Sequence, residues 1–144
     1  MVQTMKNTQI MNVNSELVLD ITDDGTSVTQ RKPGSGAGQR WDITIVDEHD
    51  NLCLIENAQN GKVLAPDGEW KVVFQPKGGA GQQWRLAPLG GCVYFIENPY
   101  SKDDRVLDID GSSKDEKALI AQYKKNIGAT ANQQWEMITS PARS

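Results

Sequence analysis

The tripeptide Gln133-Gln134-Trp135 has two counterparts earlier in the chain, Gln39-Arg40-Trp41 and Gln82-Gln83-Trp84. The three tryptophans follow one another at steps of 43 and 51 residues. A unit of this length is too small to bury its own apolar face, so neighbouring units have to share a core. The sequence therefore predicts an internal repeat of three units.

Two further patterns precede each tripeptide, always in the same order. The first is Ile-x-Asn, and the second is Val-Leu followed by Asp in two units and by Ala in one. The copies are Ile10-Met11-Asn12, Ile55-Glu56-Asn57 and Ile96-Glu97-Asn98, then Val18-Leu19-Asp20, Val63-Leu64-Ala65 and Val106-Leu107-Asp108. These matches divide a single domain, residues 1–144, into repeats at about 8–47, 48–89 and 90–138.

Short β-branched or aromatic segments fill each repeat, and turn residues such as Asn60-Gly61 separate them. No segment keeps a helical period. We expect strands near residues 16–21, 42–46, 52–56, 70–74, 93–97, 105–110, 118–123 and 135–138, and four strands per repeat make twelve in all. Three such units around a pseudo-threefold axis predict an all-β fold, the β-trefoil, whose closed sheet leaves few free edges.

The three tripeptides, with Leu-Asp-Ile upstream in two repeats, resemble the ricin B-chain-like (R-type) lectin family from roughly Thr8 to Ile138. The resemblance implies a β-trefoil that binds carbohydrate. It also implies that a competent repeat supplies four groups: an Asp after the Leu, an aromatic residue on the third strand, an Asn before the Gln, and often that Gln.

The third repeat has the full set. Asp108 would accept two adjacent sugar hydroxyls, Tyr123 would stack on the C–H face of the sugar, and Asn132 would both donate and accept. Gln133 would support them, and Asp110 would shape the loop beside Asp108. The residues 124–131 would form a pocket wall. The alternative is that Asp108 caps a turn and Tyr123 is half-buried strand packing.

The first repeat is partial. It has Asp20 and Gln39, but Arg31 or Gln30 takes the aromatic position and Gly38 replaces the Asn. Loss of the ring removes a group that shields polar contacts from water. The repeat is either structural or a weaker site of Asp20, Gln39 and Arg31, in which Arg31 faces an acidic sugar.

The second repeat lacks the carboxylate, because Ala65 stands in its place and Gly81 replaces the Asn. Only Phe74 and Gln82 match the set. Trp70 is the one tryptophan outside the tripeptides and follows the turn residues 66–69. It belongs to a second glycan subsite or to a protein interface, or it is a core or lid residue, and the sequence leaves these alternatives open.

Composition limits the partners. The net charge is −4, the isoelectric point is near 4.9, and basic residues cluster only in pairs, so we expect no nucleic-acid partner. We also expect no membrane span, and without an apolar leader the chain would be cytoplasmic or released without a signal peptide. Cys53 and Cys92 lie in apolar, strand-like settings and are expected to be buried thiols, although a disulfide between them stays open.

A catalytic role is not expected. The single histidine, His49, lies in an acidic stretch typical of a solvated hairpin, and no metal-binding, nucleophile-elbow or phosphate-loop spacing occurs. We expect no cofactor and no metal.

Two hypotheses follow. The first is a lectin for galactose or N-acetylgalactosamine glycans, a preference that the resemblance implies, with its main site in the third repeat and a homodimer needed to cross-link cells. The second is a protein-binding trefoil, a protease inhibitor or interaction module with a vestigial sugar site. Its binding loops would be residues 102–104, residues 114–117 and the surroundings of Trp70.

Overall fold

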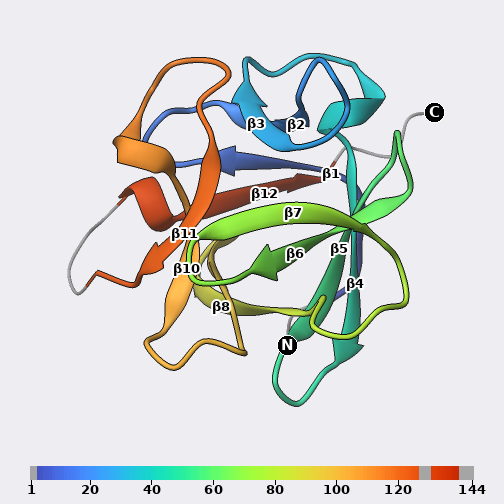
Figure 1. The fold of residues 1–144 in the computed structure, drawn as a ribbon, viewed down its shortest axis with the longest axis vertical. Helices are drawn as coiled ribbons and strands as arrows, with labels where there is room; N and C mark the ends of the chain where they lie inside the picture. Colours follow the sequence, from blue (N-terminus) through green and yellow to red (C-terminus); the bar gives the residue numbers. More distant parts are fainter. Residues whose placement is uncertain (1–2, 127–130, 140–144) are drawn as a thin grey trace.

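The computed structural model describes residues 3–126 and 131–139 of the 144-residue chain. In those residues the regular secondary structure consists of β-strands and three short 3₁₀ turns (Figure 1). The strands are β1 (Met5–Asn12), β2 (Val18–Ile21), β3 (Val28–Arg31), β4 (Trp41–Asp47), β5 (Leu52–Asn57), β6 (Lys62–Asp67), β7 (Lys71–Pro76), β8 (Trp84–Gly90), β9 (Val93–Glu97), β10 (Arg105–Ile109), β11 (Ile120–Lys124) and β12 (Trp135–Thr139). The twelve strands that the sequence predicted are thus confirmed. No helix in the described part of the chain is long and apolar enough to span a membrane.

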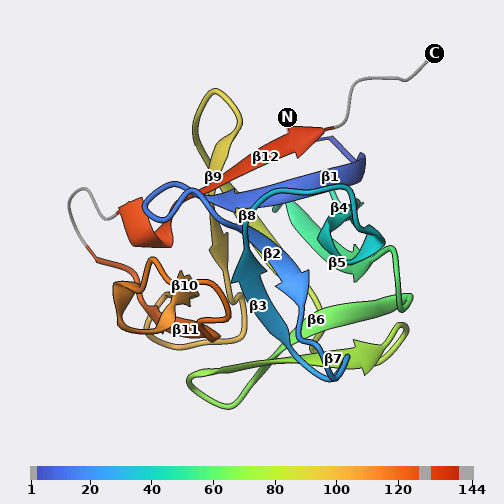
Figure 2. The ribbon, with the colours of Figure 1, turned by 90° about the horizontal axis from the view of Figure 1, so that it is seen from above.

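Six strands form a closed ring. β1 pairs with β12 and β4, β5 joins β4 to β8, and β9 joins β8 to β12, all antiparallel. The other six strands form the hairpins β2–β3, β6–β7 and β10–β11, which lie next to one another and contact through β3, β7 and β11 (Figure 2). This arrangement is the β-trefoil.

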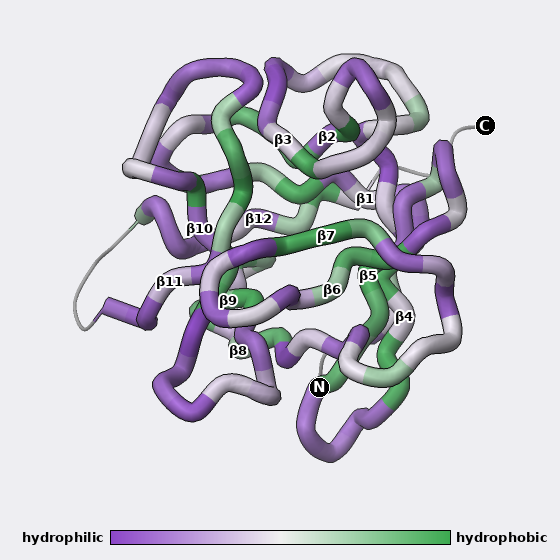
Figure 3. The backbone as a smooth tube through the Cα atoms, viewed as in Figure 1, coloured by the Kyte–Doolittle hydropathy of each residue, from purple (hydrophilic) through white to green (hydrophobic). Residues whose placement is uncertain are grey.

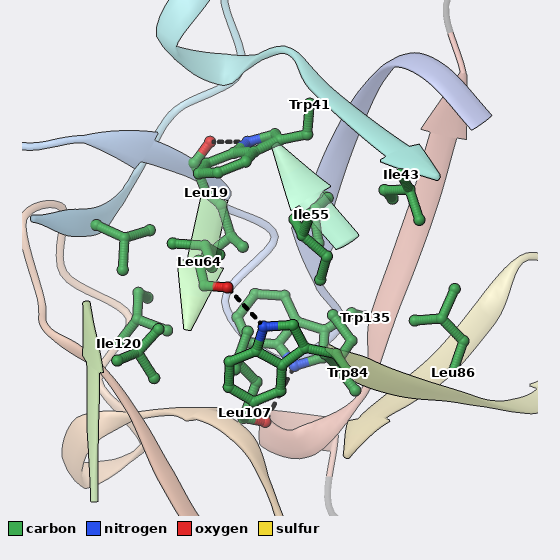
Figure 4. Packing of buried hydrophobic residues seen from close by; sticks show 14 of the residues in the cluster. Leu19, Trp41, Ile43, Ile55, Leu64, Trp84, Leu86, Leu107, Ile120 and Trp135 are labelled. Atoms are coloured by element: carbon green, nitrogen blue, oxygen red, sulfur yellow. Dashed lines mark hydrogen bonds between the residues drawn. The ribbon is translucent and has the colours of Figure 1, made fainter. Parts of the chain in front are cut away.

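Each signature tryptophan is fully buried and begins the last strand of its repeat. The indole N–H of a buried tryptophan needs an acceptor. It finds the carbonyl of the leucine on the second strand in every repeat: Trp41 to Leu19 at 3.2 Å, Trp84 to Leu64 at 3.0 Å and Trp135 to Leu107 at 3.1 Å (Figure 4). One bond made three times gives the pseudo-threefold symmetry its atomic basis.

Alternation along the strands places the remaining core. Ile43, Ile55, Leu86 and Ile96 are fully buried around the tryptophans, while their strand neighbours are more exposed. Figure 3 shows the result, with apolar segments inside the strands and hydrophilic residues in the connecting loops.

The Ile-x-Asn pattern joins repeats. Asn12 Nδ2 donates to the carbonyl of Asn132 at 2.9 Å, and Asn57 Nδ2 donates to the carbonyl of Gly38 at 3.0 Å. Asn98 departs from this rule, because its Nδ2 donates instead to Oε1 of Gln122 at 2.6 Å. In the third repeat this asparagine therefore bonds to a side chain, whereas in the other two repeats it bonds to a backbone carbonyl.

The cysteine prediction was half wrong. Cys53 is fully buried in β5, and burial raises the pKa of its thiol to about 12. Cys92 is exposed, because Gly90 and Gly91 take positive φ angles at the β8–β9 turn and carry it out of the strand. Both thiols are free.

Candidate functional site

A pocket of about 640 Å³ lies beside the third repeat. Five predicted residues line it together: Asp108, Asp110, Tyr123, Asn132 and Gln133. They come from β10, the 3₁₀ turn that follows it, β11, and the 3₁₀ turn before β12. The predicted wall at residues 124–131 lies partly outside the described residues, because residues 127–130 are not among them.

Asp108 is the buried acid of the pocket. Strand alternation sends Leu107 into the core and turns Asp108 toward the hairpin face, opposite the small side chain of Ala121. Only 8% of Asp108 is exposed. Burial raises the pKa of its carboxyl to about 6; a hydrogen bond from Gln133 opposes the rise, and the negative charge of Asp110 adds to it.

Gln133 holds the loop behind the acid. Its Nε2 donates to the carbonyl of Lys124 at 2.8 Å, and its Oε1 accepts from the backbone N–H of Asn126 at 2.9 Å. The same Nε2 reaches Oδ2 of Asp108 at the long distance of 3.5 Å. Gln133 therefore positions the loop and leaves the carboxylate weakly engaged.

The matching glutamines of the other repeats also tie their loops. Gln39 bonds to Lys32 and Gly34 at 2.9 and 2.7 Å, and Gln82 bonds to Pro76 and Gly78 at 2.9 and 3.1 Å. In all three repeats this glutamine holds the loop that precedes it.

Asn132 has one satisfied and one unsatisfied side-chain atom. Its Nδ2 donates to the carbonyl of Ile109 at 3.1 Å. Its Oδ1 is buried and has no hydrogen-bond partner among the described residues. Leaving a buried acceptor unpaired costs about 1–3 kcal/mol. A hydrogen bond from a ligand hydroxyl to this oxygen would recover that cost.

Two aromatic side chains stand at the pocket with more than half of their surface exposed. Tyr123 is 56% exposed and Trp70, from the second repeat, is 57% exposed. The repeat pattern singled out Trp70 but could not place it here, because its neighbours Asp108 and Tyr123 belong to another repeat. Asn126 lines the pocket and lies within the predicted wall at residues 124–131. The sequence missed Gln122 as a lining residue, although the match of Gln122 with Gln30 was a usable signal.

The first repeat brings its predicted residues together but satisfies them internally. Asp20 accepts from Ile21 N at 2.7 Å and from Gln39 Nε2 at 3.1 Å, and Nε of Arg31 lies 3.5 Å from it. Arg31 also pairs with Asp23 at 2.7 Å. At Gly38, a Cβ would lie 2.5 Å from Oδ1 of Asp20, so an asparagine cannot be placed there without displacing the carboxylate. The carboxylate of Asp20 is therefore already paired within its own repeat.

In the second repeat the match of Phe74 with the aromatic position was wrong. Tyr123 faces Val106 across its hairpin, and the residue that faces the matching Val63 is Gln75. Phe74 instead faces Leu64 and stacks on Trp41, with ring centroids 6.0 Å apart. It packs against the core, because the strand alternation turns it inward.

Comparisons with known proteins agree with the β-trefoil fold. The model of one family, described as ricin-type beta-trefoil lectin domain-like, matches residues 3–72, 46–123 and 80–143. No curated protein matches the sequence.

Solved structures share the fold. The designed threefold-symmetric protein ThreeFoil is 26% identical with a TM-score of 0.80, and the match covers 92% of this chain and 98% of that one. A ricin B-like lectin from Macrolepiota procera, solved with lactose, is 18% identical with a TM-score of 0.78 over 97% and 99% of the two chains. An exo-beta-1,3-galactanase from Clostridium thermocellum is 22% identical with a TM-score of 0.79 over 94% of this chain and 30% of its own.

Proposed function

The chain belongs to the ricin-type β-trefoil lectin domain-like family, and from this membership we propose that it binds carbohydrate through the third-repeat pocket, with galactose or N-acetylgalactosamine as the terminal sugar. The observation that carries the proposal is the meeting of Asp108, Tyr123, Asn132 and Gln133 at one pocket. In this proposal the protein is a binding protein and not an enzyme.

Each residue has a chemical role in the proposal. Asp108, weakly engaged by Gln133, accepts hydrogen bonds from two adjacent hydroxyls. The exposed ring of Tyr123 covers the C–H face of the sugar. Asn132 offers its unpaired Oδ1 to a further hydroxyl after a small rotation of the amide.

The preference for galactose has separate support. The lectin of similar fold was solved with lactose, which is a galactoside, and the enzyme of similar fold is a galactanase. A single open sugar site of this kind typically has an affinity of roughly micromolar to millimolar, about 4–8 kcal/mol.

Retention on immobilised galactose, followed by a glycan array, tests the proposal. Asp108→Ala should weaken binding by about 1–3 kcal/mol, because the paired hydroxyls lose their acceptor, and should release the protein from the column. The matched change Asp20→Ala in the first repeat should leave retention intact, because that carboxylate is already bonded within the protein.

The protein-binding hypothesis makes the opposite prediction. If neither Asp108→Ala nor Tyr123→Ala changes retention, the third repeat is not the sugar site. If the wild-type protein binds no glycan on the array, the carbohydrate-binding proposal itself is wrong.

A further inference from the structure

We propose that the third-repeat pocket holds two linked sugar residues, and that Trp70 of the second repeat is the platform for the second one. The inference rests on the proposed function, because it takes Asp108 and Tyr123 as the first subsite. Its starting point is that Trp70 and Tyr123 line the same pocket from different repeats, each with more than half of its surface exposed.

Strand register sets the separation of the two subsites. Asp108 on β10 pairs with Ala121 on β11, and Ala121 pairs in turn with Lys71 on β7, which directly follows Trp70. Neighbouring strands are about 4.8 Å apart, so two steps separate the backbone of Asp108 from the start of β7, beside Trp70, by about 10 Å. Figure 1 shows β10, β11 and β7 in this order. A sugar held by Asp108 therefore does not cover the Trp70 ring, and the sugar residue linked to it can stack there.

The size of the pocket fits this arrangement. Its volume of about 640 Å³ lies inside the range of about 300–1,000 Å³ found for sites that enclose drug-sized ligands, which are larger than one hexose. The pocket next to the first repeat is smaller, about 270 Å³, and its lining includes Arg31 and Lys117 but no aromatic residue. The pair of exposed rings is thus a property of this pocket and not of every repeat.

Gln122 fixes Trp70 relative to Tyr123, its own neighbour on β11. The backbone N–H of Gln122 donates to the carbonyl of Trp70 at 2.9 Å. Its buried side chain donates to the carbonyl of Lys71 at 2.7 Å and reaches that of Gly68 at 3.4 Å. The side-chain oxygen of Gln122, Oε1, accepts the hydrogen bond from Asn98 described above.

Lys71 steadies the indole itself. Its ammonium lies over the Trp70 ring, 5.4 Å from the centroid, where a cation is attracted to the π-face. A platform whose backbone and ring are both held in place loses little freedom when a ligand binds, and more of the contact energy then appears as affinity.

Isothermal titration with two kinds of probe tests the inference. The probes are methyl galactoside and methyl N-acetylgalactosaminide, and a panel of disaccharides that end in the same sugars and differ in linkage and second residue. We expect the best disaccharide to bind roughly 3- to 10-fold more tightly than its monosaccharide, a gain in the range of one ring contact. Trp70→Ala should remove that gain and leave monosaccharide affinity unchanged.

Two variants sharpen the result. Trp70→Phe keeps a ring and should keep most of the gain. Tyr100→Ala removes a ring of similar exposure that lines a different pocket, and should change neither affinity. Thermal unfolding of each variant confirms that the fold is intact.

Three outcomes overturn the inference. In the first, no disaccharide binds more tightly than its monosaccharide. In the second, Trp70→Ala keeps the gain, which would leave the proposed function standing. In the third, Trp70→Ala weakens both kinds of probe equally, which would place Trp70 in the first subsite. Failure of the proposed function looks different, because then the wild-type protein binds neither probe or Asp108→Ala affects neither.

Discussion

Asp20 and Asp108 occupy the same position of two repeats and have opposite electrostatic surroundings. Asp20 has a guanidinium, an amide and a backbone N–H around it. Asp108 is more isolated, and the nearby charge of Asp110 is also negative. A carboxylate that is buried without a cation is costly to ionise, and a ligand that brings two hydroxyls compensates that cost.

The raised pKa of Asp108, about 6 against an ordinary value near 3.8, predicts that glycan binding depends on pH. The ionised carboxylate is the stronger acceptor, so affinity for galactosides should rise as pH passes through about 6 and level off above it. At pH 5 about one molecule in ten is ionised, and binding should be about tenfold weaker than at pH 7.5. Titration calorimetry across this range measures the effect, and a flat profile would contradict it.

Stability should move the other way. Because folding raises this pKa, the protonated carboxyl favours the folded state below about 3.8, and that contribution is lost as pH rises through about 6. The unfolding free energy of wild type relative to Asp108→Asn should therefore fall by about 2–3 kcal/mol between pH 4 and pH 7.5. Opposite trends in binding and stability would identify Asp108 as the group responsible.

At the scale of the strands, the three tryptophan bonds fasten the last strand of each repeat to the second. Trp84 is fully buried, and its indole N–H donates to Leu64 at 3.0 Å. Trp84→Phe leaves a void and loses that donor, so we expect a loss of about 2–4 kcal/mol in the free energy of unfolding. Urea denaturation measures it.

A matched change separates core from surface. Trp70→Phe alters an exposed ring and should cost less than about 0.5 kcal/mol. Trp84 lies in the repeat without a carboxylate, so the folded Trp84→Phe protein should bind glycan as wild type does. Equal losses of stability in the two variants would mean that the signature tryptophan does not anchor its repeat.

The sequence predicted the features that recur in each repeat. It missed the features that depend on contacts between different repeats or on the exact register of a strand. Three tryptophans at steps of similar length predicted the twelve strands and the shared core. This worked because the apolar and polar residues alternate within each repeat, where sequence alone can be used. Phe74 was misplaced by one residue of register, and in a strand one residue reverses the face. Trp70 reaches the pocket only through the pairing of β7 with β11, which no spacing within one repeat contains.

At the scale of the molecule, the three repeats share one backbone fold but have different surfaces. The closed ring and the three hairpins are common to all repeats, so the fold does not require every repeat to bind. The first repeat uses its acid in an ion pair, and the second has alanine there. Within the described residues, only the pocket at the third repeat combines a weakly engaged acid with exposed rings, and one of those rings, Trp70, comes from the second repeat.

This asymmetry predicts how the protein cross-links cells. A chain with one competent site holds one glycan, and avidity needs two sites that can engage at the same time. We therefore expect agglutination of galactose-bearing cells only at concentrations where sedimentation velocity shows a homodimer, and none from Asp108→Ala at any concentration. A strictly monomeric wild-type protein that still agglutinates cells would show that the first or second repeat also binds, despite the ion pair at Asp20 and the missing acid at Ala65.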